Sequence, residues 1–230
     1  MRNITGYINN YEEAVLMVHA IRLGCFPTMM ERLKPEERCR IESGDIFCFI
    51  ENANGMKRWT DGRIWSPSKI CGEFLVYQEV PRHLSKNSIK KRRVGESPYN
   101  VNLVRKEDIV DRTTLHKKTI SIRLEDTTYH VISYYRPIFA TYSLMDIPFF
   151  QQLNEALNLF PELKDDKFVQ ENIKNDSEFY TKYNIQRDFQ KMVMEEEKRN
   201  ALEKIAVDVL RFLWRKKVKP RTPIRKDCRL

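Results

Sequence analysis

Basic and aromatic residues alternate in residues 56–79, where the sequence reads MKRWTDGRIWSPSKICGEFLVYQE. Lysine and arginine neutralise phosphates, and arginine also enters narrow grooves and pairs with base edges. Trp59 and Trp65 flank a Thr-Asp-Gly turn, in which Gly62 can adopt the positive φ that a tight turn requires. We therefore interpret residues 56–72, called the basic finger below, as a rigid element that presents cations to nucleic acid.

The second part of the basic finger carries the signals of a helix start. Ser66 is suited to be an N-cap and Pro67 to be the first helical residue. Gly72 would end such a helix after little more than one turn. Because a helix N-terminus attracts anions, we expect a short helix over residues 66–72 that binds a phosphate.

The positive charge of the chain is concentrated in two segments. The net charge is +9 and the sequence pI is about 9.3. Residues 81–119 hold eleven Lys/Arg against four Asp/Glu, and residues 211–230 hold nine against one. A nearly neutral body with basic patches fits a protein that binds nucleic acid or an anionic surface. On charge alone, a solvated surface with Lys/Arg-rich tails explains the pattern equally well.

Membrane and metal signals are weak in this sequence. No apolar run approaches the ~20 residues needed to span a bilayer, and the N-terminus lacks an apolar signal-peptide core. We therefore expect a soluble intracellular protein with no membrane partner. The five cysteines form no C-x-x-C pair and the four histidines share no ligand spacing. We expect no metal and no cofactor, and we expect Cys48 and His19 to be packing residues.

The elements that must position the basic finger are predicted from periodicity and caps. A short strand is expected at residues 5–8, and Asn10 should cap a helix that ends at Gly24. A second short helix is expected over residues 28–33. Residues 45–51 are apolar on both faces and predict a buried strand, and residues 74–80 predict the returning strand. Two strands would therefore anchor the finger.

A β-hairpin and a helical region follow in the second part of the chain. Residues 118–124 alternate, with Ile120, Ile122 and Leu124 on one face, and a Glu125-Asp126 turn leads to the partner strand, 129–135. From about residue 148 the pattern is helical, and a helix is expected from about 188 to 217. Its apolar stripe consists of Leu202, Ile205, Ala206, Val209, Phe212 and Leu213. We expect this stripe to dock on the protein's own sheet rather than to form a dimer seam.

These blocks together resemble a known family. The blocks TGYI, ESGDIFCFIE, RWTDGRIWSPSK, GEFLVYQE and LHKKTISIRLEDTTYHVISYYRP resemble, in this order, the WOPR domain of fungal regulators of morphological switching. The resemblance implies an α+β fold, in which two interlocked sequence halves form a single globular domain around an antiparallel or mixed β-sheet with flanking helices. We expect the first half at 1–80, a basic insert without clear periodicity at 81–112, the second half at 113–185, and a C-terminal amphipathic helix and basic tail at 186–230.

The resemblance also implies a function: a nuclear, sequence-specific transcription regulator that binds double-stranded DNA as a monomer, alone or with other regulators. The RWTDGR loop would enter the minor groove of an A·T-rich site with an embedded G·C pair read from the major groove. Arg63, at the turn tip, is the expected inserted residue, and the tryptophans are expected to stiffen the finger. The full set of expected DNA-binding residues is Arg63, Arg58, Lys57, Thr60, Gly62, Trp59, Ser66, Ser68, Lys69, Thr5, Lys117 and Lys118.

The sequence suggests two additional roles, one for a basic block and one for a hydroxyl residue. The block of residues 90–93, KKRR, is interpreted as a nuclear-import signal or an auxiliary DNA contact, with a solvated loop as the alternative. Thr60, two residues after Arg58, is a candidate regulatory phosphorylation site, and its alternative role is to hydrogen-bond its own turn.

Other classes of protein remain as alternatives. A metal-dependent nuclease would need clustered carboxylates and a lysine, but Asp61 is explained by its turn. No Gly-rich phosphate loop, nucleophile elbow or His/Cys pair appears, so we do not expect an enzyme. A protein that binds RNA or single strands, or binds nucleic acid without sequence specificity, is the third class, in which Trp59 and Trp65 would stack on bases.

Overall fold

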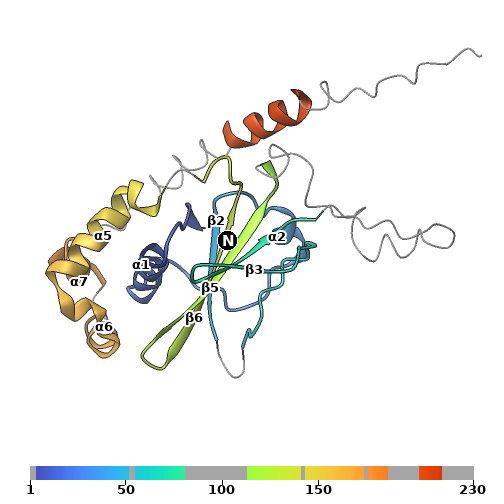
Figure 1. Ribbon diagram of the computed structural model, residues 1–230. Helices are drawn as coiled ribbons and strands as arrows, with labels where there is room; N and C mark the ends of the chain where they lie inside the picture. The colour runs from blue at the N-terminus through green and yellow to red at the C-terminus, as the bar shows by residue number, and fades with distance from the viewer. Residues whose placement is uncertain are drawn as a thin grey trace, which may run out of the picture.

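The computed structural model describes residues 4–51, 55–80, 113–140, 143–173, 176–185 and 202–213. In this part of the chain a six-stranded antiparallel sheet has the order β1-β2-β6-β5-β4-β3 (Figure 1). The strands are β1 (Ile4–Thr5), β2 (Asp45–Ile50), β3 (Lys69–Cys71), β4 (Phe74–Gln78), β5 (His116–Leu124) and β6 (Thr127–Tyr135). Because β5 and β6 lie between β2 and β4, the two sequence halves interlock in one sheet. The expected α+β fold is therefore confirmed.

Helices cover one face of this sheet. They are α1 (Tyr11–Arg22), α5 (Pro148–Leu159), α6 (Asp166–Asn172) and α7 (Asp176–Lys182), with 3-10 turns at Leu144–Asp146 and Pro161–Lys164, and Figure 1 shows them on the same side. Asn10 caps α1, because its side chain accepts a hydrogen bond from the Glu13 N–H at 2.9 Å. The apolar side of α1 and α5 packs on sheet residues such as Cys48 and Ile120. This is the larger of two buried clusters.

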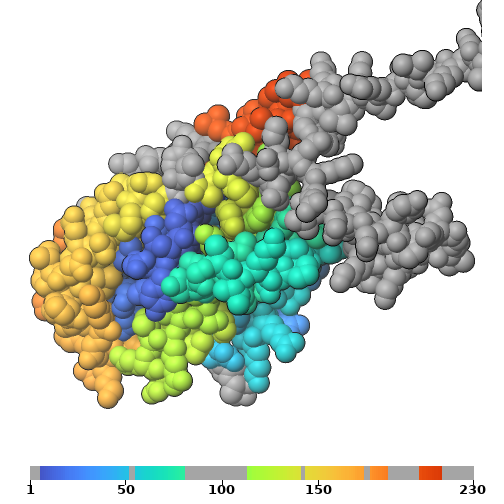
Figure 2. All heavy atoms as spheres, in the orientation of Figure 1, coloured from blue at the N-terminus to red at the C-terminus, as the bar shows by residue number. Residues whose placement is uncertain are grey.

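The opposite face of the sheet is covered mainly by loops and by the short helix α2 (Pro35–Cys39). Its buried cluster contains Phe47, Phe49, Ile132 and Tyr134, and Trp59 and Trp65 of the basic finger pack against it. Figure 2 shows residues 55–80, coloured cyan to teal, as a continuous part of the surface beside α1. The basic finger therefore lies on the sheet and is not a free hairpin.

Several local expectations were correct. The strands at 45–51 and 74–80 and the hairpin of residues 118–135 are present as β2, β4, β5 and β6. Cys48 is buried in β2. His19 is buried in α1, where its Nδ1 accepts a hydrogen bond from Arg22. Burial, assisted by the charges of Arg22 and Lys164, lowers the pKa of His19 to about 4, so this packing residue is neutral at pH 7.

The prediction of a helix over residues 66–72 is wrong. Residues 69–71 form β3, and the Ser66 N–H donates to the Gln78 carbonyl at 2.8 Å, so the segment is the extended partner of β4. Pro67 is compatible with this structure because β3 is an edge strand, where a missing N–H donor is tolerated. Gly72 has φ 58° and lies at the β3–β4 turn. The phosphate site at a helix N-terminus therefore does not exist.

Three further expectations need correction or lie outside the described residues. Residues 28–33 form no helix, and the first strand is shorter than expected, at Ile4–Thr5. The apolar stripe of the C-terminal helix does not dock on the sheet, because most of its large side chains are exposed in residues 202–213. The insert at 81–112, its block at 90–93 and the tail after residue 213 lie outside the described part of the chain.

Candidate nucleic-acid interface

The basic finger is organised around the Asp61 carboxylate, which is 4% exposed. Its Oδ1 accepts hydrogen bonds from the Arg63 N–H at 3.1 Å and the Trp65 indole at 2.9 Å. Its Oδ2 accepts from the Lys117 ammonium at 2.9 Å and the Tyr134 hydroxyl at 2.7 Å. The Thr-Asp-Gly segment is therefore more than a turn, because its aspartate connects the finger to strands β5 and β6.

The ionisation of this cluster follows from its contacts. Burial alone would raise the pKa of Asp61, but the hydrogen bonds from Trp65 and Tyr134 and the charge of Lys117 outweigh burial and hold that pKa below its usual range. Burial lowers the pKa of Lys117, an effect that Asp61 opposes. Burial and the neighbouring Asp61 raise the pKa of Tyr134. Asp61 is therefore a carboxylate at neutral pH, and Tyr134 keeps the proton that it donates.

The two tryptophans of the finger pack inside it. The ring of Trp59 lies 4.9 Å from that of Phe47, and its indole N–H donates to the Tyr134 hydroxyl at 2.6 Å. The ring of Trp65 lies 6.0 Å from that of Tyr134, and the Lys117 ammonium lies 4.4 Å above it. Both residues therefore pack as expected, and their stiffening role stays a prediction.

The outer surface of the finger carries exposed cations and hydroxyls. Lys57, Arg58 and Thr60 are exposed immediately before the buried Asp61, and neither cation has an ion-pair partner among the described residues. Ser68 and Lys69 are exposed at the start of the β3–β4 hairpin. These five side chains can meet a ligand without breaking a contact of the fold.

The Arg63 side chain was expected to extend from the turn tip, but it is bound within the domain. Its Nη1 donates to the Glu79 carboxylate at 2.7 Å and its Nη2 to the Ile41 carbonyl at 2.7 Å, and its side chain is 22% exposed. Its guanidinium therefore braces the base of the finger and does not extend from the tip. The role of Arg63 in DNA binding stays a prediction, and the structure favours Arg58 as the side chain available for a groove.

Several other residues expected to bind DNA have polar groups that are already bonded within the domain. The ammonium of Lys117 is paired with Asp61, and that of Lys118 donates to the Ile8 carbonyl at 3.0 Å. Ser66 Oγ accepts a hydrogen bond from the Gln78 N–H at 3.1 Å. Thr5 lies in β1, paired with Asp45 of β2. Lys117, Lys118 and Ser66 are thus occupied by contacts within the domain, and Thr5 lies away from the finger in the sheet order.

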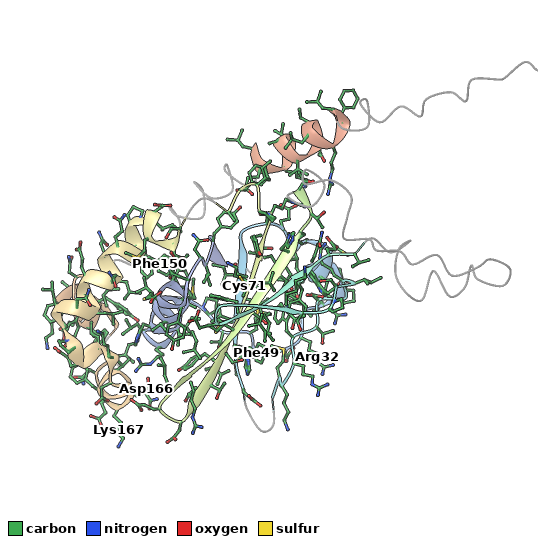
Figure 3. All side chains as sticks on the ribbon, viewed as in Figure 1. Arg32, Phe49, Cys71, Phe150, Asp166 and Lys167 are labelled. Carbon is green, nitrogen blue, oxygen red and sulfur yellow. The ribbon has the colours of Figure 1, made fainter. Side chains whose placement is uncertain are left out.

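The sequence did not single out Arg38 of α2, which lies against the finger. Gly62 has φ 71°, and a Cβ placed on it would come within 3.3 Å of Arg38 Cδ. The Arg38 Nε donates to the Leu33 carbonyl at 2.8 Å, which fixes the side chain beside the turn. Figure 3 shows Arg32, from the same segment, pointing outward on this side of the sheet. Only the three-dimensional contact reveals this relation, because 24 positions separate Arg38 from Gly62.

No group of three or more His, Cys, Asp or Glu side chains that could hold a metal ion occurs in the described residues. None of the helices described for this chain is long and apolar enough to cross a membrane.

Comparisons with known proteins identify a family. The model of the Gti1/Pac2 family matches residues 3–106. A cAMP-independent regulatory protein, pac2, of Schizosaccharomyces pombe is 40% identical over 80 residues, which are 35% of this chain and 34% of the relative. White-opaque regulator 1 of Candida albicans is 44% identical over 89 residues, 37% of this chain and 11% of the relative.

A solved complex of the Wor1 WOPR domain of Candida albicans with a 13-bp double-stranded DNA is also similar. It is 27% identical with a TM-score of 0.49, over 75% of this chain and 99% of that one. Over residues 3–106 the chain is therefore similar to the Gti1/Pac2 (WOPR) family. The matched segment spans about a third of the length of the pac2 protein and about a tenth of that of the white-opaque regulator.

Proposed function

We propose that this protein is a transcription regulator that binds double-stranded DNA through the exposed side of the basic finger. The observation that carries the proposal is the arrangement around Asp61. Lys57 and Arg58 are exposed directly before a carboxylate that four neighbouring groups fix in place. Preorganisation of this kind lowers the conformational entropy lost on binding. Relatives named as transcription regulators support the same function.

The proposed contact is insertion of an arginine into the minor groove. A narrow A·T groove concentrates negative potential and attracts a guanidinium. Arg58 is the first candidate because its side chain is exposed and unpaired in the described residues, whereas Arg63 is braced by Glu79. Arg63 keeps a second role, in which it holds the finger base and contributes to the local potential.

Phosphate contacts would then position the finger on the duplex. Lys57, Ser68 and Lys69 are exposed around it and supply an ammonium, a hydroxyl and a second ammonium. Such contacts give affinity and register but carry little sequence information. The resemblance to WOPR domains supports an A·T-rich site with an embedded G·C pair, read by a monomer in the nucleus, with other regulators as possible partners.

The alternative of single-strand or RNA binding differs in what it needs from the tryptophans. Base stacking requires an open aromatic face. Trp59 and Trp65 are packed against Phe47 and Tyr134, and their indole N–H groups are already hydrogen-bonded. We therefore infer that the duplex is the preferred ligand.

A selection from a random duplex library tests the proposal. We expect enrichment of a short A·T-rich motif, followed by tight binding of that duplex and weaker binding of either of its single strands. Failure to enrich any motif, or equal affinity for the single strands, would contradict sequence-specific duplex binding. Cleavage of plasmid DNA in the presence of a divalent metal would instead support the nuclease alternative.

A further inference from the structure

The C-terminal helix, residues 202–213, contacts the rest of the molecule along one narrow side. Glu203 and Val207 are 7% and 3% exposed. The large apolar side chains that are at least half exposed are Leu202, Ile205, Val209, Phe212 and Leu213. Figure 1 shows this helix in red, apart from α5–α7 and above one end of the sheet. Its place is therefore set by the few residues on its inner side and not by its apolar stripe.

Two polar contacts connect this side of the helix to the rest of the molecule, one to Tyr7 and one to Glu42. The Tyr7 hydroxyl donates to Glu203 Oε1 at 2.6 Å and lies 3.1 Å from Ser43 Oγ. The Lys204 ammonium lies 3.2 Å from Glu42 Oε1. The Lys204 pair is exposed and contributes little, whereas the buried contact of Tyr7 with a carboxylate is of the stronger kind. Glu203 is thus the main polar attachment of the helix.

The same loop holds the base of the basic finger. The Ile41 carbonyl accepts the hydrogen bond from Arg63 Nη2 at 2.7 Å. Ser43 Oγ also accepts from the Arg136 N–H at 3.0 Å, which ties the loop to the end of β6. Residues 41–43 therefore lie between two elements that are far apart in sequence. The C-terminal helix contacts them directly through Lys204 and indirectly through Glu203, by way of the Tyr7 hydroxyl. The basic finger contacts them through Arg63.

We propose that Glu203 is a positioning residue, through which the C-terminal helix fixes loop 41–43 and so the conformation of the basic finger. The path runs from Glu203 through Tyr7 and Ser43 to Ile41, and from Ile41 to the Arg63 guanidinium. The Arg63 backbone N–H in turn donates to Asp61. The consequence for DNA affinity rests on the proposed function, but the consequence for finger order is a property of the free protein.

The direction in which Glu203→Gln changes DNA affinity distinguishes a positioning role of Glu203 from a purely electrostatic effect of its charge. Glu203→Gln removes a negative charge, and by long-range electrostatics alone this raises the affinity for a polyanion. Positioning predicts the opposite, a lower affinity for the selected duplex, because the finger is less well ordered before binding. Asp208→Asn is the matched control, since it removes one negative charge from an exposed position on the same helix.

The experiment compares the 230-residue wild-type chain, Glu203→Gln and Asp208→Asn by hydrogen exchange without DNA and by binding to the selected duplex. For Glu203→Gln we expect faster exchange of the Arg63 amide and of amides 41–44, by about two- to thirty-fold, and a loss of affinity in the same range. Amides of β5 and β6 should keep their wild-type rates, and Asp208→Asn should resemble wild type in exchange and bind as well or slightly more tightly.

Two results would overturn the proposal: unchanged exchange in the finger, or equal effects of the two substitutions. If Glu203→Gln fails to fold, Tyr7→Phe tests the same contact, because it removes the donor hydroxyl and keeps the ring. The Tyr7→Phe variant should give the same pattern of exchange, and wild-type exchange in the finger would count against positioning. If the wild type binds no duplex, the proposed function fails while the exchange result still decides the role of Glu203.

Discussion

Asp61 and Lys117, 56 positions apart in the sequence, form a buried ion pair with a distance of 2.9 Å between Oδ2 and Nζ. Their side chains are 4% and 10% exposed. The pair joins the turn of the basic finger to strand β5, so the shape of the proposed DNA-binding surface depends on both sequence halves. Removing either charge leaves the other buried without its partner, which is the costly case for an ion pair.

We predict that Asp61→Asn destabilises the protein by about 3–5 kcal/mol, the range for breaking a buried pair. The asparagine keeps the size of the side chain, but it cannot balance the Lys117 charge. Chemical denaturation followed by far-UV circular dichroism measures the change in the free energy of unfolding.

The double variant Asp61→Asn/Lys117→Met is the control for this effect. Replacing the ammonium by an apolar group removes the unpaired charge, so the double variant should be more stable than Asp61→Asn alone. A double variant that is less stable than the single one would show that the two side chains do not interact as the geometry indicates.

The stability difference between wild type and Asp61→Asn should depend on pH. The pKa of Asp61 is lowered in the fold, so its contribution is fully present above the ordinary aspartate pKa. That contribution is lost as pH falls through this value, ~3.9, and then through the lower pKa of the folded state. Denaturation at pH 7, 5, 4 and 3 should therefore show a constant gap down to about pH 5 and a narrowing gap below it. A gap that does not narrow in acid would contradict a charged Asp61 in the native state.

Most of the sheet could be predicted from the sequence because its strands carry strong local signals. Alternation in residues 118–124 and the buried apolar run at 45–51 depend only on the period of two in a strand. The helix predicted from Ser66 to Gly72 was wrong because Ser-Pro is equally compatible with a helix start and with an edge strand. The hydrogen bonds to Gln78 decided between them, and that partner lies outside the local window.

The candidate site was predictable as a segment but not in the role of each residue. The exposed Lys57 and Arg58 and the packing of Trp59 fit the expectation. The paired states of Lys117 and Arg63 depend on Asp61 and Glu79, and a single sequence gives no signal for such distant pairs. The alternation of side chains along β5 gives only the face on which Lys117 lies. Lys117 pairs with Tyr134 in the register, and both belong to the face beneath the finger.

We predict that a negative charge at Thr60 weakens DNA binding. Thr60 is exposed next to Arg58, so a phosphate would add about −1.5 to −2 of charge beside the proposed contact and could capture the arginine. Thr60→Glu should therefore bind the selected duplex more weakly than Thr60→Val, measured by fluorescence anisotropy. Equal affinities of two folded variants would show that charge at this position is unimportant.

Arg63→Ala is expected to change both stability and binding. The substitution removes the contacts to Glu79 and Ile41, so the melting temperature should fall together with the affinity for DNA. Thermal unfolding and anisotropy on the same samples measure the two effects. Lower affinity with an unchanged melting temperature would instead support the original expectation that Arg63 contacts the groove directly.

The affinity of Arg58→Ala for the selected duplex tests the central claim most directly. Arg58 is exposed and has no ion-pair partner in the described residues, so the melting temperature should stay at its wild-type value. Loss of one groove contact should weaken binding by about 1–3 kcal/mol. Arg123→Ala is the matched control, because it removes one positive charge from an exposed side chain near the end of β5. A large loss for Arg58→Ala and a small one for Arg123→Ala is the predicted result, and wild-type affinity of Arg58→Ala would contradict DNA binding by the basic finger.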